Sequence, residues 1–350
     1  MNNTYFHRLN QYSPTRFWVN NPTPRQASLS IKEGAINCTT NPTYAYKQLI
    51  DEEMKVDVLT FMKKAIEITG KTEDTVDYVQ RMLVKQLLKI FLPLYEKNPG
   101  KCGFVSIQGD PNMDENPDHI IKEAFEYAKL GKNFIAKIPV TESGLIAIEA
   151  CIKEGFPVIG TEIMSIAQTV ALCELYKKVS ESSGKKPALF VTNITGIYDQ
   201  YIAEWMKKTK AAIPLDVVWY AGLTVCKKQY KIFKERNYPG VMLGGGARNF
   251  KHFTELVGYD MHITINWKNF ADKLIEQDMP IINRYDCHTP DGITRELLAK
   301  VPDFKKAYDE DGLTVKDFQN FGPVNLFRNM FLDGWNNLKV AIDEFKKGGR

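Results

Sequence analysis

The middle of the chain carries the stretch Asn133-Phe134-Ile135-Ala136-Lys137-Ile138-Pro139-Val140-Thr141, a short apolar run with a lysine inside it and a proline close behind. Lysine is rarely fully buried unless it is paired or has a chemical task. In a low-dielectric environment the pKa of the amine falls, and the neutral amine can attack a carbonyl to form a Schiff base. The alternative is a lysine at a strand end whose ammonium group reaches water.

On both sides of this stretch, short apolar segments alternate with amphipathic helical patterns. This alternation is typical of parallel strands that are covered on both faces. Repeated eight times over roughly 250 residues, it favours a (β/α)8 TIM barrel over an open sheet. The predicted strands are 16–21, 34–42, 103–108, 134–140, 157–161, 188–193, 240–246 and 261–266.

We expect the whole chain, residues 1–350, to form a single domain around this barrel. The barrel occupies about 16–275, and the polar residues 1–15 are expected to form an arm. A helical extension, about 276–350, follows the barrel. Its last helix, about Val324–Lys347, is amphipathic and is expected to pack on the outside of the barrel.

The composition excludes several classes of function. The formal net charge is only +4 over 350 residues, without a block of basic residues, so nucleic-acid binding is not indicated. No apolar run of ~18 residues could span a membrane, and the N-terminus does not resemble a signal peptide. The six cysteines contain no C-x-x-C pair, and the five histidines lack metal-ligand spacing. We therefore expect a cytoplasmic protein without a metal or a cofactor.

Polar residues stand at the ends of the predicted strands. In a barrel, functional groups lie at the C-terminal ends of the strands, where all eight ends meet at one mouth. Lys137 stands at the end of the fourth strand, so the other strand ends are expected to surround its amine. They are Asn20 or Asn21, Asn41, Gln108, Thr161, Asn193, Arg248 and Asn266.

Several of these strand ends lie in segments that resemble the motifs of the transaldolase family. The most specific is Ala136-Lys137-Ile138-Pro139-Val140-Thr141-Glu142-Ser143-Gly144-Leu145, which is similar to the family's K-x-P-x-T-x-x-G segment. Thr39-Thr40-Asn41-Pro42-Thr43 resembles T-T-N-P-S, and Gly244-Gly245-Gly246-Ala247-Arg248-Asn249 resembles G-A-S-F-R-N. Val105-Ser106-Ile107-Gln108 resembles V-S-x-E/Q, with the glutamine of the small fructose-6-phosphate aldolases.

The resemblance implies a class I mechanism and a sugar or sugar-phosphate substrate. Lys137 would form a Schiff base with a ketose, cleavage would release an aldehyde, and the bound dihydroxyacetone unit would pass to another aldehyde or to water. Gln108 and Thr161, on the strands beside Lys137, would hold the water that transfers protons. Substrate contacts are implied for Asn41, Asn193 and, at a phosphate, Arg248. Since relatives form dimers or rings, a homo-oligomer is also implied.

Four positions depart from the family pattern. They are Asn20 (or Asn21 in a shifted register) for the aspartate that acts as base, Gln108 for glutamate, Gly196 for an arginine of the phosphate site and Gly246 for a serine. An amide cannot take up a proton at neutral pH, so the acid or base would come from Glu162 or Tyr198. For Glu162, an outward side chain in a salt bridge with a helix is the simpler interpretation.

The departures leave three functions open. The leading hypothesis is a transaldolase-like transferase that moves a dihydroxyacetone unit between sugars. The first alternative is an aldolase-like lyase that acts on fructose 6-phosphate or on an unphosphorylated or modified ketose. The second is a catalytically idle homologue that binds sugar phosphates, which the missing carboxylates suggest.

Overall fold

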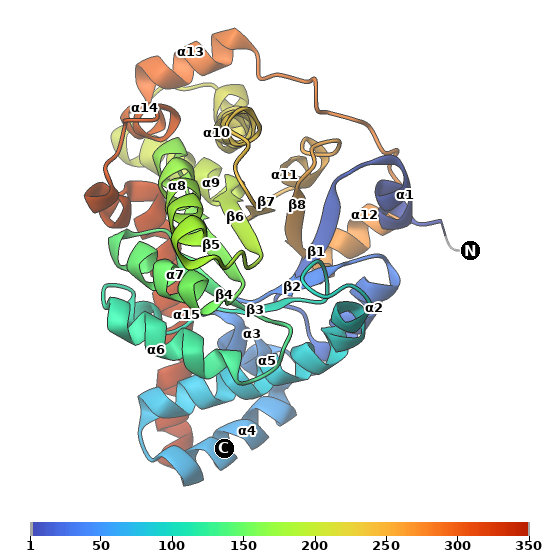
Figure 1. The fold of residues 1–350 in the computed structure, drawn as a ribbon, viewed down its shortest axis with the longest axis vertical. Coiled ribbons are helices and arrows are strands. Elements are labelled where there is room, and N and C mark those ends of the chain that lie inside the picture. The colour runs from blue at the N-terminus through green and yellow to red at the C-terminus, as the bar shows by residue number, and fades with distance from the viewer. Residues whose placement is uncertain (1–2, 349–350) are drawn as a thin grey trace.

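The computed structural model describes residues 3–348, and eight parallel strands form a closed barrel at its centre (Figure 1). Each strand pairs with the next one, and β1 closes the ring on β8 with Arg16 opposite His262. The TIM barrel and all eight predicted strands are thereby confirmed. The strands are β1 Arg16–Asn20, β2 Asn37–Thr39, β3 Val105–Ile107, β4 Phe134–Pro139, β5 Val158–Ile163, β6 Leu189–Ile194, β7 Val241–Gly245 and β8 His262–Asn266.

The inside of the barrel is filled by an apolar layer with a polar layer above it. Because successive side chains of a strand point to opposite faces, the residues two positions further along each strand also face inward. The apolar layer consists of Trp18, Phe104, Ile135, Ile159, Phe190 and Leu243. Two positions further along, the polar layer includes Asn20, Lys137, Thr161 and Thr192. The apolar layer therefore separates the polar layer from solvent at the N-terminal end of the barrel.

Helices cover the outside of the barrel and connect its strands. Helix α7 begins after Thr141, whose side chain accepts a hydrogen bond from the Gly144 amide, and ends at Gly155 in the left-handed conformation. No helix within residues 3–348 combines the length and the apolar character that crossing a membrane requires. The helices are α2 Pro24–Lys32, α3 Tyr44–Ile50, α4 Lys55–Thr69, α5 Thr72–Lys97, α6 Pro117–Ala128, α7 Glu142–Glu154, α8 Ile166–Ser183, α9 Thr195–Thr209, α10 Leu215–Glu235, α11 Lys251–Thr254 and α12 Asp272–Gln277.

The N-terminal segment, expected as a polar arm, contains helix α1 Tyr5–Tyr12, which packs on the outer wall beside β1 (Figure 1). Its apolar face is fully buried, and the ring of Phe6 stacks on the ring of Phe17 with centroids 4.2 Å apart. The spacing of Tyr5, Phe6 and Leu9 follows the helical period, but only three apolar positions carry the pattern. The polar residues between them hid the helix in the sequence.

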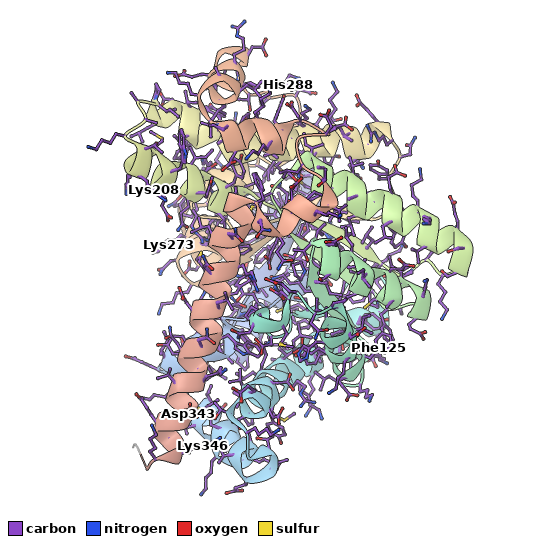
Figure 2. The ribbon with its side chains drawn as sticks, turned by 90° about the vertical axis from the view of Figure 1, so that its left-hand side faces the viewer. Phe125, Lys208, Lys273, His288, Asp343 and Lys346 are labelled. Carbon is purple, nitrogen blue, oxygen red and sulfur yellow. The ribbon has the colours of Figure 1, made fainter. Side chains whose placement is uncertain are left out.

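The C-terminal extension contains α13 Asp291–Lys300, α14 Pro302–Tyr308, a 3-10 helix Val315–Asn320 and the long helix α15 Gly322–Lys346. The far end of α15 lies on the outside of the barrel, as predicted, where Asp343 accepts a hydrogen bond from Thr72 (Figure 2). Its first half does not follow the prediction. Phe327, Met330 and Phe331 reach over the barrel mouth and line the cavity there. The first half of the helix therefore forms part of the cavity wall at the mouth, and its far end packs on the outside of the barrel.

Candidate functional site

A cavity of about 100 Å³ opens at the C-terminal ends of the strands, above the polar layer. Its wall brings together the predicted residues Asn20, Asn41, Lys137, Thr161 and Arg248. Strand ends that lie far apart in the sequence meet here because every strand of a parallel barrel points to the same mouth.

Lys137 lies at the floor of the cavity and is only 8% exposed. Its Nζ donates a hydrogen bond to the carbonyl oxygen of Thr40 at 3.2 Å, and the ring centroid of Phe331 lies 5.6 Å from the same atom. Burial lowers the pKa of the amine to about 8, although the negative charge of Glu162 acts in the opposite direction. Roughly a tenth of the amine is therefore neutral at pH 7, compared with less than a thousandth for an ordinary lysine.

Two polar side chains on the strands beside Lys137 have an atom without a protein partner. The hydroxyl of Thr161 lines the cavity, is buried, and makes no hydrogen bond within residues 3–348. Gln108 lies just beyond the end of β3, is fully buried and does not line the cavity, and its Oε1 is also without a partner in the described part of the chain. Buried polar atoms are almost always satisfied, by ordered water where no protein group is near. Both atoms suit the predicted role of holding a water.

Glu162 follows Thr161 on β5 and is 1% exposed. The pairing of β5 with β6 shifts between Gly160 and Ile163, and Glu162 takes a left-handed φ of 60° at this bulge. Its Oε1 accepts a hydrogen bond from Nε2 of Gln108 at 2.9 Å, so the bond joins the two strands that flank Lys137. The interpretation of Glu162 as an outward residue in a salt bridge is therefore wrong. Burial raises the pKa of its carboxyl to about 7.

Two residues named from the sequence lie away from the cavity. Tyr198 packs against Phe304, and its hydroxyl donates to the carbonyl oxygen of Asp303 at 3.1 Å. Asn193 points out of the barrel, where its amide donates to Gln229 of α10. Because strand side chains alternate, the cavity is lined instead by the residues on either side of Asn193, which are Thr192 and Ile194.

Two of the asparagines on the wall, Asn20 and Asn41, are held in different ways. Asn20 is engaged through both polar atoms: its Oδ1 accepts from the hydroxyl of Thr39 at 2.9 Å, and its Nδ2 donates to Asn266 at 2.8 Å. The Oδ1 of Asn41 accepts from the amide and the hydroxyl of Thr43. Within residues 3–348 the Nδ2 of Asn41 has no acceptor, so it can donate to a substrate hydroxyl.

Two cations, Arg248 and Lys47, face the cavity away from its floor. Nε of Arg248 donates to Gln200 at 3.0 Å, and burial lowers the pKa of its guanidinium. Burial and the charge of Arg248 together lower the pKa of Lys47 on α3. Lys47 was missed in the sequence, where its place one turn into the helix after the T-T-N-P-type segment was the available signal. No aspartate or glutamate of the described residues lines the cavity.

The backbone that carries Arg248 is held by His252 of α11. Nδ1 of His252 accepts hydrogen bonds from the amides of Arg248 and Asn249 at 3.1 and 3.3 Å. Its Nε2 lies 2.9 Å from a carboxylate oxygen of Asp199, which also pairs with Lys251 at 2.8 Å. Because Nδ1 accepts, the imidazole proton is on Nε2 and points to Asp199. No group of His, Cys, Asp and Glu suited to a metal ion occurs within residues 3–348.

Comparison with known proteins gives one family and several distant relatives. The model of the family Transaldolase/Fructose-6-phosphate aldolase matches residues 25–312. A transaldolase of Neisseria meningitidis serogroup A is 27% identical over 150 residues, which is 42% of each chain. One of Prochlorococcus marinus is 24% identical over 295 residues, 79% of each chain. One of Mycobacterium ulcerans is 30% identical over 149 residues, 41% of this chain and 38% of its own. This chain thus spans about two fifths of the length of the Neisseria and Mycobacterium relatives.

Proposed function

Because the chain belongs to the transaldolase/fructose-6-phosphate aldolase family, we propose that it transfers a dihydroxyacetone unit between sugars through a Schiff base on Lys137. The observation that carries this proposal is a buried amine at the floor of the mouth cavity, with its pKa lowered to about 8. Schiff-base formation requires a neutral amine within reach of a carbonyl, and burial under Phe331 supplies both the neutral form and the exclusion of water.

The reaction begins with attack of the neutral Nζ of Lys137 on the carbonyl carbon of a ketose, and the proton that the nitrogen then releases passes to the carbonyl oxygen, which becomes a hydroxyl. A second proton on this hydroxyl lets it leave as water, and a C=N iminium remains. A base then removes the proton of the C4 hydroxyl, the C3–C4 bond breaks, and an aldehyde leaves. The electron pair of that bond converts the iminium into an enamine.

Transfer is completed by an acceptor aldehyde. The enamine carbon attacks the acceptor carbonyl, and the new alkoxide takes a proton. Water then hydrolyses the iminium, which releases the product sugar and restores the amine of Lys137.

The protons of these steps need a carrier beside Lys137. A water held by the hydroxyl of Thr161 and by Oε1 of Gln108 can deliver and remove them, since both atoms lack a protein partner among the described residues. Asn20 cannot replace this water as a base, because its amide does not take up a proton at neutral pH and its oxygen already accepts from Thr39.

The substrate is a sugar phosphate in this proposal. Arg248 and Lys47 place two positive charges on a wall that has no carboxylate among the described residues. A phosphate between them would gain charge-assisted hydrogen bonds, and the fork of Arg248 can bind it in a bidentate manner. Lys47 thus takes the place of the arginine that the family pattern has at position 196.

Borohydride trapping tests the function directly. The protein is incubated with fructose 6-phosphate, dihydroxyacetone and related ketoses and then reduced, and the modified peptide is located by mass spectrometry. We expect an adduct on Lys137, its loss in Lys137→Ala, and its retention in Lys132→Ala, which removes an exposed lysine. An absence of adduct across the panel would refute the proposal. Turnover that needs an acceptor aldehyde supports the transferase, whereas cleavage without an acceptor identifies the alternative lyase.

A further inference from the structure

The cavity wall has no acidic residue among the described residues, yet the residue that follows one of the wall residues carries a fully buried carboxylate. Glu162 follows the wall residue Thr161 and is 1% exposed. An ionised carboxylate is rarely buried without a partner or a task. Glu162 has no ion pair within 4.0 Å in the described part of the chain, and its side-chain bond is the one to Gln108. Its burial therefore calls for an explanation.

The backbone at Glu162 is held in an unfavourable conformation. A φ of 60° at a residue other than glycine costs roughly 1–2 kcal/mol, and such residues cluster at functional sites. Gln168 maintains the bulge, because its Nε2 donates to the carbonyl oxygens of Val140 and Glu162 at 2.9 and 3.1 Å. Its Oε1 accepts from the amide of Met164 at 2.8 Å. The fold thus holds Glu162 in its buried position at an energetic cost.

The carboxylate determines which way the amide of Gln108 points. An ionised carboxylate can only accept hydrogen bonds, so Nε2 of Gln108 must face Glu162 and Oε1 must face away from it. The backbone of Gln108 is fixed as well, since its carbonyl oxygen accepts from Nε2 of Gln80 at 2.7 Å. The register of β3 and β4 pairs Ile107 with Ala136, so the next residues, Gln108 and Lys137, are inward neighbours. Gln108, which carries the free Oε1, is therefore the neighbour of Lys137 in the barrel register.

We propose that Glu162 is a positioning residue of the lysine site, whose carboxylate holds the Gln108 amide so that its free carbonyl oxygen binds the proton-carrying water. This inference rests on the proposed Schiff-base function. It gives the lysine site a carboxylate, although no carboxylate of the described residues lies on the cavity wall. In the neutral form, Glu162 could instead donate a proton to Oε1 of Gln108, and the amide would lose its fixed direction.

The charges around Glu162 come from three other elements. Lys137 of β4 and Arg328 of α15 favour its ionised form, and the charge of Glu162 in turn raises the pKa of Asp114 in the loop before α6. Arg328 pairs with two acids of this loop: its Nε lies 3.8 Å from Asp114 and its Nη1 lies 3.3 Å from Glu115. In return, the charge of Glu162 raises the pKa of Lys137 against the effect of burial. Removal of this charge must lower the pKa of the lysine further.

The test compares Glu162→Gln with wild type in the pH profile of borohydride trapping and in turnover. We expect the rise of trapping with pH to move to lower pH, because the amine becomes neutral earlier. We expect kcat to fall about a hundredfold, the usual scale for loss of assisted proton transfer, with little change in KM. Glu154→Gln, which changes an exposed glutamate at the far end of α7, should match wild type in both measurements.

A second variant keeps the proposal testable if Glu162→Gln folds poorly. Gln108→Leu removes the amide whose hydrogen bond favours the ionised form of Glu162, so kcat should fall to a similar extent and the trapping profile should also move to lower pH. The double variant should be no slower than either single one, because both act on the same water. If wild type is trapped but Glu162→Gln shows an unshifted profile and an unchanged kcat, the inference about Glu162 is overturned and the proposed function stands. No trapping by wild type would overturn the proposed function instead.

Discussion

Replacement of Lys47 by methionine tests whether the cavity binds a phosphate. Lys47 and Arg248 line the same wall, and no carboxylate of the described residues lies on that wall. Methionine keeps the length and the apolar stem of the side chain but removes its charge. A charge-assisted hydrogen bond to phosphate is worth ~1.5–3 kcal/mol, so kcat/KM for a phosphorylated ketose should fall roughly 10- to 150-fold.

The assay compares fructose 6-phosphate with unphosphorylated dihydroxyacetone as donors, with unphosphorylated glyceraldehyde as the common acceptor. Only the reaction of fructose 6-phosphate should be impaired in Lys47→Met, and Lys47→Arg should retain most of it. Lys132→Met, which removes an exposed lysine paired with Glu96, should behave as wild type. Equal losses with both donors would show that Lys47 supports the geometry of the site, and no loss with fructose 6-phosphate would refute the phosphate assignment.

Two further substitutions test how the site is enclosed. Phe331→Ala should admit water to Lys137, raise the pKa of its amine from about 8 and move the trapping profile to higher pH. The variant should also lose about 3–5 kcal/mol from the free energy of unfolding. An unmoved profile in a folded variant would contradict the role of Phe331. In Gly196→Ala the new Cβ would lie 2.5 Å from the carbonyl oxygen of Gly246 and 2.8 Å from the amide of Arg248. Because of this crowding, the variant should be destabilised by about 1–3 kcal/mol in thermal unfolding and should turn over phosphorylated donors more slowly. Gly292→Ala, which meets no atom within 4 Å, is the matched control, and equal melting of the two variants would count against the crowding.

Part of the candidate site could be read from the sequence because it depends on the order of strands. An apolar run that ends in a polar residue has only one place in a parallel barrel, with its last residues at the mouth. Lys137, Thr161 and Asn41 were found in this way, and the structure brings them to one cavity. Asn193 was misplaced by a single residue, because a strand buried on both faces gives no sign of which side chains face inward.

The amino-acid sequence by itself determined the barrel, the candidate lysine and the family, since these follow from local periodicity and from short motifs. Only the tertiary structure decided the surroundings of the lysine. The direction of Glu162 depends on a bulge that Gln168 stabilises, and the enclosure of the mouth depends on where Phe331 of a distant helix comes to lie. Lys47 and Arg248, from distant segments, line the same cavity. These contacts link segments far apart in the chain, and no local pattern encodes which of them meet. The stretch around Lys137 therefore names the proposed nucleophile, and its long-range neighbours set its pKa and its access to water.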